Sequence, residues 1–159
     1  KITPQYFIFS LDSVITAEVG ARYVFTFEDQ AAPLPWQRRP RHHYASTHET
    51  VVDKTVGGND EGFKLVSVKG PADNPDQLVL KLADTGREVT MSKDAPFRRV
   101  DAYSADLKYD PDKYNGTGLR AGDHLSFAGD DYNVIAIDKN EVILLAQSNQ
   151  KKFTLPYTP

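Results

Sequence analysis

Residues 38–49, RRPRHHYASTHE, contain the densest group of side chains in this chain that could do chemistry. Three of the four histidines lie here, namely His42, His43 and His48. Glu49 and three arginines accompany them. Imidazole and carboxylate groups serve as zinc ligands and general bases, whereas guanidinium groups bind anions. The stretch could therefore be a metal site, a catalytic centre, a contact for an anion or a partner, or a solvated loop.

The spacing within this stretch disfavours metal binding and catalysis. His42 and His43 are adjacent, so in a strand their side chains would point to opposite faces. A zinc site needs three or four converging ligands on rigid elements, and neighbouring arginines oppose a cation. A general base needs a nucleophile and an orienting acid, and no spacing singles out Ser46 or Thr47. We predict no catalytic residue, no metal site and no cofactor.

Two acidic motifs elsewhere in the chain are also expected to be turns. The segment 110–118, DPDKYNGTG, resembles a calcium loop, but Tyr114 and Asn115 stand where that motif needs an acid or amide and then glycine. Asp130 and Asp131 are adjacent in a short loop, where carboxylates solvate and end a turn. The sequence contains no phosphate-binding glycine loop, nucleophile elbow or HExxH motif. We therefore expect a protein that is not an enzyme.

Two short segments have the composition of partner-contact sites. Tryptophan and arginine are enriched in binding hot spots, and strand edges can accept another strand. The predicted contact residues are Trp36, Arg38, Arg39 and Arg41 in the first segment and Lys151, Lys152 and Phe153 in the second.

Composition limits the class of protein. The 159 residues suffice for one domain or two small ones, and 40% hydrophobic with 11% aromatic residues excludes a disordered chain. A net charge of −3 gives no drive toward nucleic acid or an anionic membrane, and the lack of cysteine excludes disulfides. No apolar run approaches 18 residues, so we expect any anchor or export signal to precede Lys1.

Alternation of apolar and polar residues dominates the sequence and predicts strands. These segments are 6–11, 22–29, 62–70, 77–84 and 87–92. Residues 101–110 could form a helix or a strand, and the alternation of Tyr103, Ala105, Leu107 and Tyr109 favours a strand. Asp84, Thr85 and Gly86 predict a tight hairpin. Residues 123–155 predict a four-stranded meander with charged outer strands as its edges and both faces of its central strands covered.

Three segments interrupt this pattern. Residues 12–21 could form one short helix with Asp12 as N-cap and Gly20 near its end. The segments 29–46 and 110–122 are too rich in proline or glycine for regular structure. The fold predicted for residues 1–159 is a single all-β domain, a two-layer antiparallel β-sandwich of immunoglobulin-like or related type, with at most one short helix and a long Pro-rich loop at about 29–46.

The C-terminal segment GLRAGDHLSFAGDDYNVIAIDKNEVILLAQSNQKKFTL resembles the small periplasmic β-domain of type IV pilus and type II secretion accessory proteins. Glycine and asparagine serve its turns and aliphatic residues fill its core. The matching positions are Gly122, Asp123, Gly129, Tyr132, Val134, Ile137, Asn140, Val142, Leu144, Thr154 and Leu155. The wider stretch from FKLVSVKG to DLKYDP is similar to proteins encoded in pilus-like gene clusters of Akkermansia and related mucin-degrading bacteria.

This resemblance implies an exported protein of the periplasm or outer cell surface whose partners are other envelope or pilus-assembly proteins. It implies no nucleic-acid partner, a membrane link only through a segment outside this chain, and possible oligomers. The family motifs are structural and carry over no catalytic residue, and residues 1–60 match nothing in the module. We expect a non-enzymatic protein that acts by protein–protein contacts.

Two alternatives stay open at this point. A module that binds mucin glycans would use exposed aromatic residues, for which Trp36, Tyr44, Tyr109 and Tyr114 are available. A metal hydrolase would use the three clustered histidines.

Overall fold

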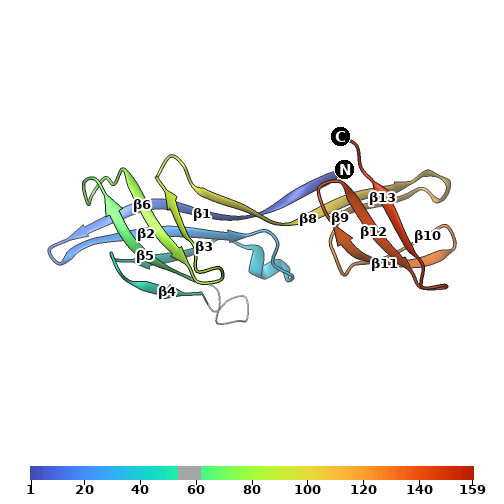
Figure 1. Cartoon of the computed structure of the whole chain (residues 1–159), viewed down its shortest axis with the longest axis horizontal. Helices are drawn as coiled ribbons and strands as arrows, with labels where there is room; N and C mark the ends of the chain where they lie inside the picture. Colours follow the sequence, from blue (N-terminus) through green and yellow to red (C-terminus); the bar gives the residue numbers. More distant parts are fainter. Residues whose placement is uncertain (54–61) are drawn as a thin grey trace. The chain divides into compact units, whose positions relative to one another are not determined.

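Strands make up nearly all the regular structure of this chain (Figure 1). The computed structural model describes residues 1–53 and 62–159, and this described part contains no α-helix. The strands are β1 (Ile2–Ala17), β2 (Gly20–Asp29), β3 (Arg41–Ala45), β4 (Thr50–Val52), β5 (Gly62–Lys69), β6 (Gln77–Leu82), β7 (Glu88–Met91), β8 (Phe97–Tyr109), β9 (Tyr114–Leu119), β10 (His124–Phe127), β11 (Asp130–Ile137), β12 (Glu141–Ala146) and β13 (Lys152–Pro156). Two short 3₁₀ helices, η1 (Pro35–Arg38) and η2 (Asp110–Asp112), complete the described elements.

The strands form three antiparallel sheets. Their orders are β3-β2-β1-β8-β9, β4-β5-β6-β7 and β10-β11-β12-β13. Except for β1 and β8, neighbouring strands in a sheet also follow one another along the chain. This architecture confirms the all-β sandwich class predicted from the alternating pattern.

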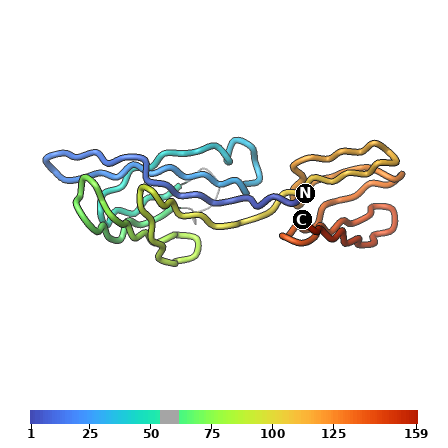
Figure 2. The backbone as a smooth tube through the Cα atoms, turned by 90° about the horizontal axis from the view of Figure 1, so that it is seen from above, coloured from blue at the N-terminus to red at the C-terminus, as the bar shows by residue number. Residues whose placement is uncertain are grey.

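Contacts within the chain group it into two compact units. The larger unit comprises Tyr6–Arg99, and the smaller comprises Lys1–Gln5 together with Val100–Pro159. Strands β1 and β8 therefore contribute residues to both units, and the two ends of the chain lie near each other within the smaller one (Figure 2). The expectation of a single domain stays a prediction.

Aromatic rings join the two layers of the larger unit. The register of β1 and β2 places Phe9 opposite Phe27, and their rings meet edge to face at 4.3 Å. Phe63 on β5 belongs to the other sheet and packs edge to face on Phe9, with ring centroids 4.7 Å apart. Each such pair adds about 0.5–1.5 kcal/mol beyond the apolar area that it buries. Alternating phenylalanines thus fix which face of each sheet turns inward.

The smaller unit has its own core of mostly aliphatic side chains. Ala105 on β8 packs with Leu125, Val134, Val142 and Leu144 of β10, β11 and β12. The meander predicted for residues 123–155 is confirmed, with β10 and β13 as its edges. Coverage of both faces of its central strands was a wrong prediction, because Ile135 on β11 is exposed to solvent.

The predicted helix at 12–21 does not form. Its residues continue β1 to Ala17 and, after a turn, begin β2 at Gly20, which has φ of +124°. The β-branched residues from Val14 to Thr16 favour an extended backbone, and pairing of Val14 with Tyr23 of β2 adds packing that no local pattern reveals.

Both segments predicted as irregular contain a strand. Arg41–Ala45 forms β3 and pairs with β2, so the Pro-rich loop of the larger unit ends at Pro40. The strand begins directly after Pro40, and each residue of Arg41–Ala45 has a backbone N–H to donate. Tyr114–Leu119 forms β9 beside β8, because Gly118 adopts a positive φ of +62° next to a register shift in that pair.

Candidate functional site

The histidine stretch forms the edge strand β3 of its sheet. Strand alternation separates the two adjacent histidines, as predicted. His42 is exposed, and its Nδ1 lies 3.3 Å from Asp12 Oδ2 and 3.1 Å from Thr26 Oγ1. His43 turns inward, where its ring meets the ring of Phe27 edge-on at 5.1 Å. The two imidazoles therefore face different environments.

A buried carboxylate that sequence reasoning missed organises the inward side of β3. Asp53 is only 2% exposed, and its Oδ2 accepts a hydrogen bond of 2.6 Å from Arg41 Nε. His43 Nε2 lies 2.9 Å from the same oxygen. Arg41 also donates from its NH1 group to the Gln37 carbonyl at 2.6 Å. This buried network ties β3 to η1 and to the residue after β4.

The network has a structural role, because it joins β3 to η1 and to the residue after β4. Asp53 already has two partners on one oxygen, and a buried ion pair that loses one member is destabilised by about 3–5 kcal/mol. Asp53 follows the plain strand TVV and matches no motif, so only its spatial partners reveal its role.

His48 and Glu49 take separate structural roles in the next turn. His48 has a positive φ of 69° and donates its backbone N–H to the Leu65 carbonyl at 2.7 Å. The Glu49 carboxylate accepts the backbone N–H of Ser46 at 2.7 Å. Within residues 1–53 and 62–159, no group of three or more histidines and acidic residues is placed to hold a metal ion.

The predicted contact residues around Trp36 separate into an exposed and an anchored set. Trp36 on η1 is 52% exposed, and Arg39 is exposed beside it. Arg38 instead donates to the carbonyls of Ala32 and Pro33 at 2.7 and 2.8 Å, which fixes the loop. The Arg41 side chain is only 13% exposed and serves the Asp53 network. The surface that could meet a partner here is therefore smaller than the four predicted residues.

The aromatic residues considered for glycan binding also divide. Tyr44 is exposed, with the Arg22 guanidinium 5.7 Å from its ring centre. Tyr109 and Tyr114 instead pack against Phe127, with ring centroids 5.1 and 5.5 Å apart. Of the four candidates, Trp36 and Tyr44 keep a largely open ring face.

The second predicted contact segment forms the exposed edge strand β13. All five residues of β13 are exposed, and within the described chain it pairs only with β12. The Ala146 N–H donates to the Lys151 carbonyl at 2.9 Å, and the register is unbroken along the strand. Hydrogen-bonded and non-hydrogen-bonded residue pairs alternate along antiparallel strands. The backbone groups of Phe153 and Leu155 therefore bond to β12, whereas those of Lys152 and Thr154 point outward.

A groove in the smaller unit runs beside β13. Its volume is about 270 Å³, and its apolar lining includes Ile2, Leu107, Val142 and Leu155. Its charged lining residues are Lys1, Asp106 and Lys108. Phe153 and Leu155, which share one face of β13, remain 43% and 37% exposed. An unpaired backbone edge and an incompletely covered apolar core thus occur together.

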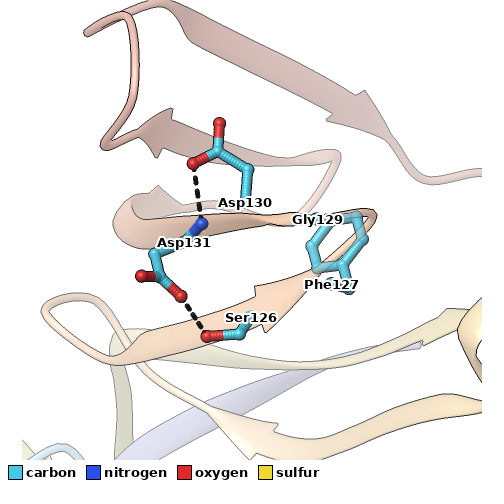
Figure 3. Close-up of a pocket in the computed structure, with 5 residues that line it drawn as sticks. All are labelled: Ser126, Phe127, Gly129, Asp130 and Asp131. Carbon is cyan, nitrogen blue, oxygen red and sulfur yellow. Dashed lines mark hydrogen bonds between the residues drawn. The ribbon is translucent and has the colours of Figure 1, made fainter.

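The hairpin between β10 and β11 forms a shallow hollow in which both acidic residues are engaged (Figure 3). Asp130 accepts the Asp131 backbone N–H at 2.8 Å and the Ser148 hydroxyl, while Asp131 accepts the Ser126 hydroxyl. The hydrogen bond from Ser148 lowers the pKa of Asp130 below its usual value. Both carboxylates accept hydrogen bonds that stabilise this hairpin.

No helix in the described residues has the length and apolar character needed to cross a membrane. The chain matches no protein-family model, no curated protein and no solved structure.

Proposed function

We propose that this chain is a non-enzymatic, exported protein of a pilus-like or secretion apparatus, which binds an extended segment of a partner protein along β13. The coincidence of the free β13 edge with the adjacent apolar groove carries this proposal. The resemblance of the C-terminal meander to envelope assembly modules supports the choice of partner class.

The backbone of β13 offers a short, defined site for strand addition. Lys152 and Thr154 present their N–H and C=O groups outward, so an added strand gains up to four main-chain hydrogen bonds. Each such bond contributes about 0.5–1.5 kcal/mol net. Pro156 has no N–H, which ends the pairing after this point.

The groove supplies selectivity for apolar side chains. In strand addition, main-chain bonds give affinity and pockets for alternate side chains give specificity. Leu107, Val142 and Leu155 line the groove, and burial of one aliphatic side chain contributes about 1.5–3 kcal/mol. Lys151 and Lys152 favour a partner with an acidic residue beside its apolar ones.

A matched pair of proline variants tests this proposal. Thr154→Pro removes an outward N–H from β13 and leaves the pairing with β12 intact. Thr90→Pro is the control, because β7 is also the edge strand of its sheet. The Leu82 N–H donates to the Arg87 carbonyl, so alternation along the β6–β7 pair points the backbone N–H of Thr90 outward. Binding to purified proteins encoded beside this gene is measured by titration calorimetry.

We expect at least one neighbouring protein to bind, with affinity reduced tenfold or more by Thr154→Pro and unchanged by Thr90→Pro. Circular dichroism establishes that both variants fold. A partner that binds Thr154→Pro as tightly as the unchanged chain contradicts strand addition at β13. Failure of every neighbouring protein to bind contradicts the assembly function itself.

A further inference from the structure

A pocket of about 200 Å³ in the larger unit combines three arginines with an apolar lining. It lies between the β6–β7 hairpin and the start of β8. Its cationic residues are Arg87, Arg98 and Arg99, and its apolar residues are Leu82, Val89 and Phe97. We propose that this pocket binds a carboxylate carried on a small apolar group, either as a free organic acid or as the C-terminal residue of a polypeptide.

Two of the three arginines lie against aromatic rings, on opposite faces of the sheet because neighbouring residues of a strand alternate. The Arg98 guanidinium lies 4.8 Å from the centre of the Tyr6 ring, and that of Arg99 lies 5.0 Å from the centre of the Phe7 ring. Arg99 also donates to Asp84 at 2.8 Å. Arginines fixed before binding lose less conformational freedom when a ligand arrives.

The positive charge at this pocket is not fully balanced. Asp84 offsets Arg99, but Arg87 and Arg98 form no hydrogen bond or ion pair through their side chains within the described residues. The chain as a whole is acidic, with a net charge of −3, and the Arg87 guanidinium is a local positive charge against that background. Planar guanidinium groups bind carboxylates through two parallel hydrogen bonds.

A third polar group can orient the ligand. Thr85 lies at the rim, and its hydroxyl oxygen accepts the backbone N–H of Arg87 at 3.3 Å. The hydroxyl proton stays free to donate to an incoming carboxylate oxygen.

The apolar lining selects against a bare inorganic anion. Leu82 is buried beneath the pocket, while Val89 and Phe97 are partly buried. Sulfate or phosphate would leave these side chains without contacts, whereas a ring or branched chain beside a carboxylate would cover them. An apolar cavity of about 150 Å³ holds benzene, so this pocket has the volume for one aromatic or branched side chain.

This site is distinct from β13 and does not depend on the proposed strand addition. The ligand chemistry is tested with N-acetyl-phenylalanine, which carries a free carboxylate, and with its amide, which does not. Each is titrated into the ¹⁵N-labelled full chain at pH 7, and amide chemical shifts are followed. The tripeptide Gly-Gly-Phe and sodium sulfate are titrated in parallel.

We expect saturable shifts at Thr85, Val89 and Phe97 with N-acetyl-phenylalanine and none with the amide. Arg87→Gln reduces the affinity at least fivefold, whereas Arg39→Gln, which removes the same charge from a residue outside the pocket, leaves it unchanged. Tighter binding of Gly-Gly-Phe identifies a polypeptide C-terminus as the source, and equal binding identifies a small acid.

Three results would overturn the proposal. Equal shifts with acid and amide would show that the carboxylate is not recognised. Binding of sulfate as tight as that of N-acetyl-phenylalanine would assign the pocket to bare anions. An unchanged affinity in Arg87→Gln, whose exposed side chain makes loss of folding unexpected, would place the ligand elsewhere.

Discussion

Replacement of Asp53 by alanine tests the buried network most directly. The change removes a carboxylate that pairs with both Arg41 and His43, while the Arg41 side chain stays largely shielded from water. Because Asp53 is 2% and Arg41 13% exposed, solvent cannot replace the lost interaction. Loss of one member of such a pair costs about 3–5 kcal/mol, a large part of the 5–15 kcal/mol typical of a folded domain.

The effect on unfolding follows from this free energy. With a urea dependence of about 2 kcal/mol per molar, the midpoint for Asp53→Ala should fall by roughly 2 M. Trp36 is the single tryptophan, and it lies on η1, whose Gln37 carbonyl accepts from Arg41. Its fluorescence therefore reports unfolding at the network itself.

A matched exposed pair separates burial from simple charge loss. Asp12→Ala removes the partner of His42 on the outer face of the same strand, where both side chains are solvated. This change should cost at most about 1 kcal/mol. Addition of Arg41→Met to Asp53→Ala should recover part of the lost stability, because the largely buried charge that lost its Asp53 carboxylate is then removed.

Similar costs for Asp53→Ala and Asp12→Ala would refute the reasoning. So would a double variant that is less stable than Asp53→Ala alone, because the penalty would then come from lost packing and not from an unpaired charge.

Three further outcomes follow from the described contacts. Phe153→Pro, which removes an inward N–H, should be less stable in urea than Thr154→Pro by about 1–3 kcal/mol; equal stabilities would contradict the deduced alternation. Ser148→Ala should raise the pKa of Asp130 in an NMR titration, because the Ser148 hydroxyl lowers that pKa. The stability that this carboxylate contributes is present above its unfolded pKa and is lost as the pH falls through its folded pKa. An unchanged Asp130 titration in the variant would exclude the hydrogen bond. Phe63→Ala should cost about 3–5 kcal/mol by calorimetry, since three phenylalanine rings surround it; a loss below about 1 kcal/mol would show that the layers do not depend on this ring.

Strands with strong alternation were predictable from the sequence. Tyr23, Phe25 and Phe27 repeat at every second position, and this period alone places them on one buried face. The hairpin at Gly86 was equally accessible, because a positive φ of 68° at that residue follows from its turn chemistry. The edge position of β13 followed from Lys151 and Lys152, which lie just before the strand and at its first residue.

The elements that local patterns missed depend on pairing at a distance. The segment 12–21 carries an N-cap residue and a terminal glycine, but ten residues of β2 beside it favour a hairpin. Strand β3 was hidden because its side chains are charged or aromatic and follow three prolines. Its inward arginine and histidine are tolerated only because Asp53 meets them.

The candidate sites show the same division. The two predicted contact segments were identified from residue types, yet type alone could not show that Arg38 binds its own loop. The arginine pocket joins residue 87 to residues 98 and 99 across two elements, and no spacing rule connects them. Such sites are visible only once the strands are placed.

Because the smaller unit combines both ends of the chain, it can be completed only late in synthesis. Gln5 bonds Ser104 and Arg120 at 2.9 Å each, so its partners are synthesised about a hundred residues later. Residues Tyr6–Arg99 meanwhile emerge as one uninterrupted stretch. The larger unit can therefore fold first, whereas Lys1–Gln5 can pack in the smaller unit only after Val100–Pro159 has been synthesised. A chain that ends at residue 99 would contain every residue of the larger unit and lack Val100–Pro159 of the smaller one.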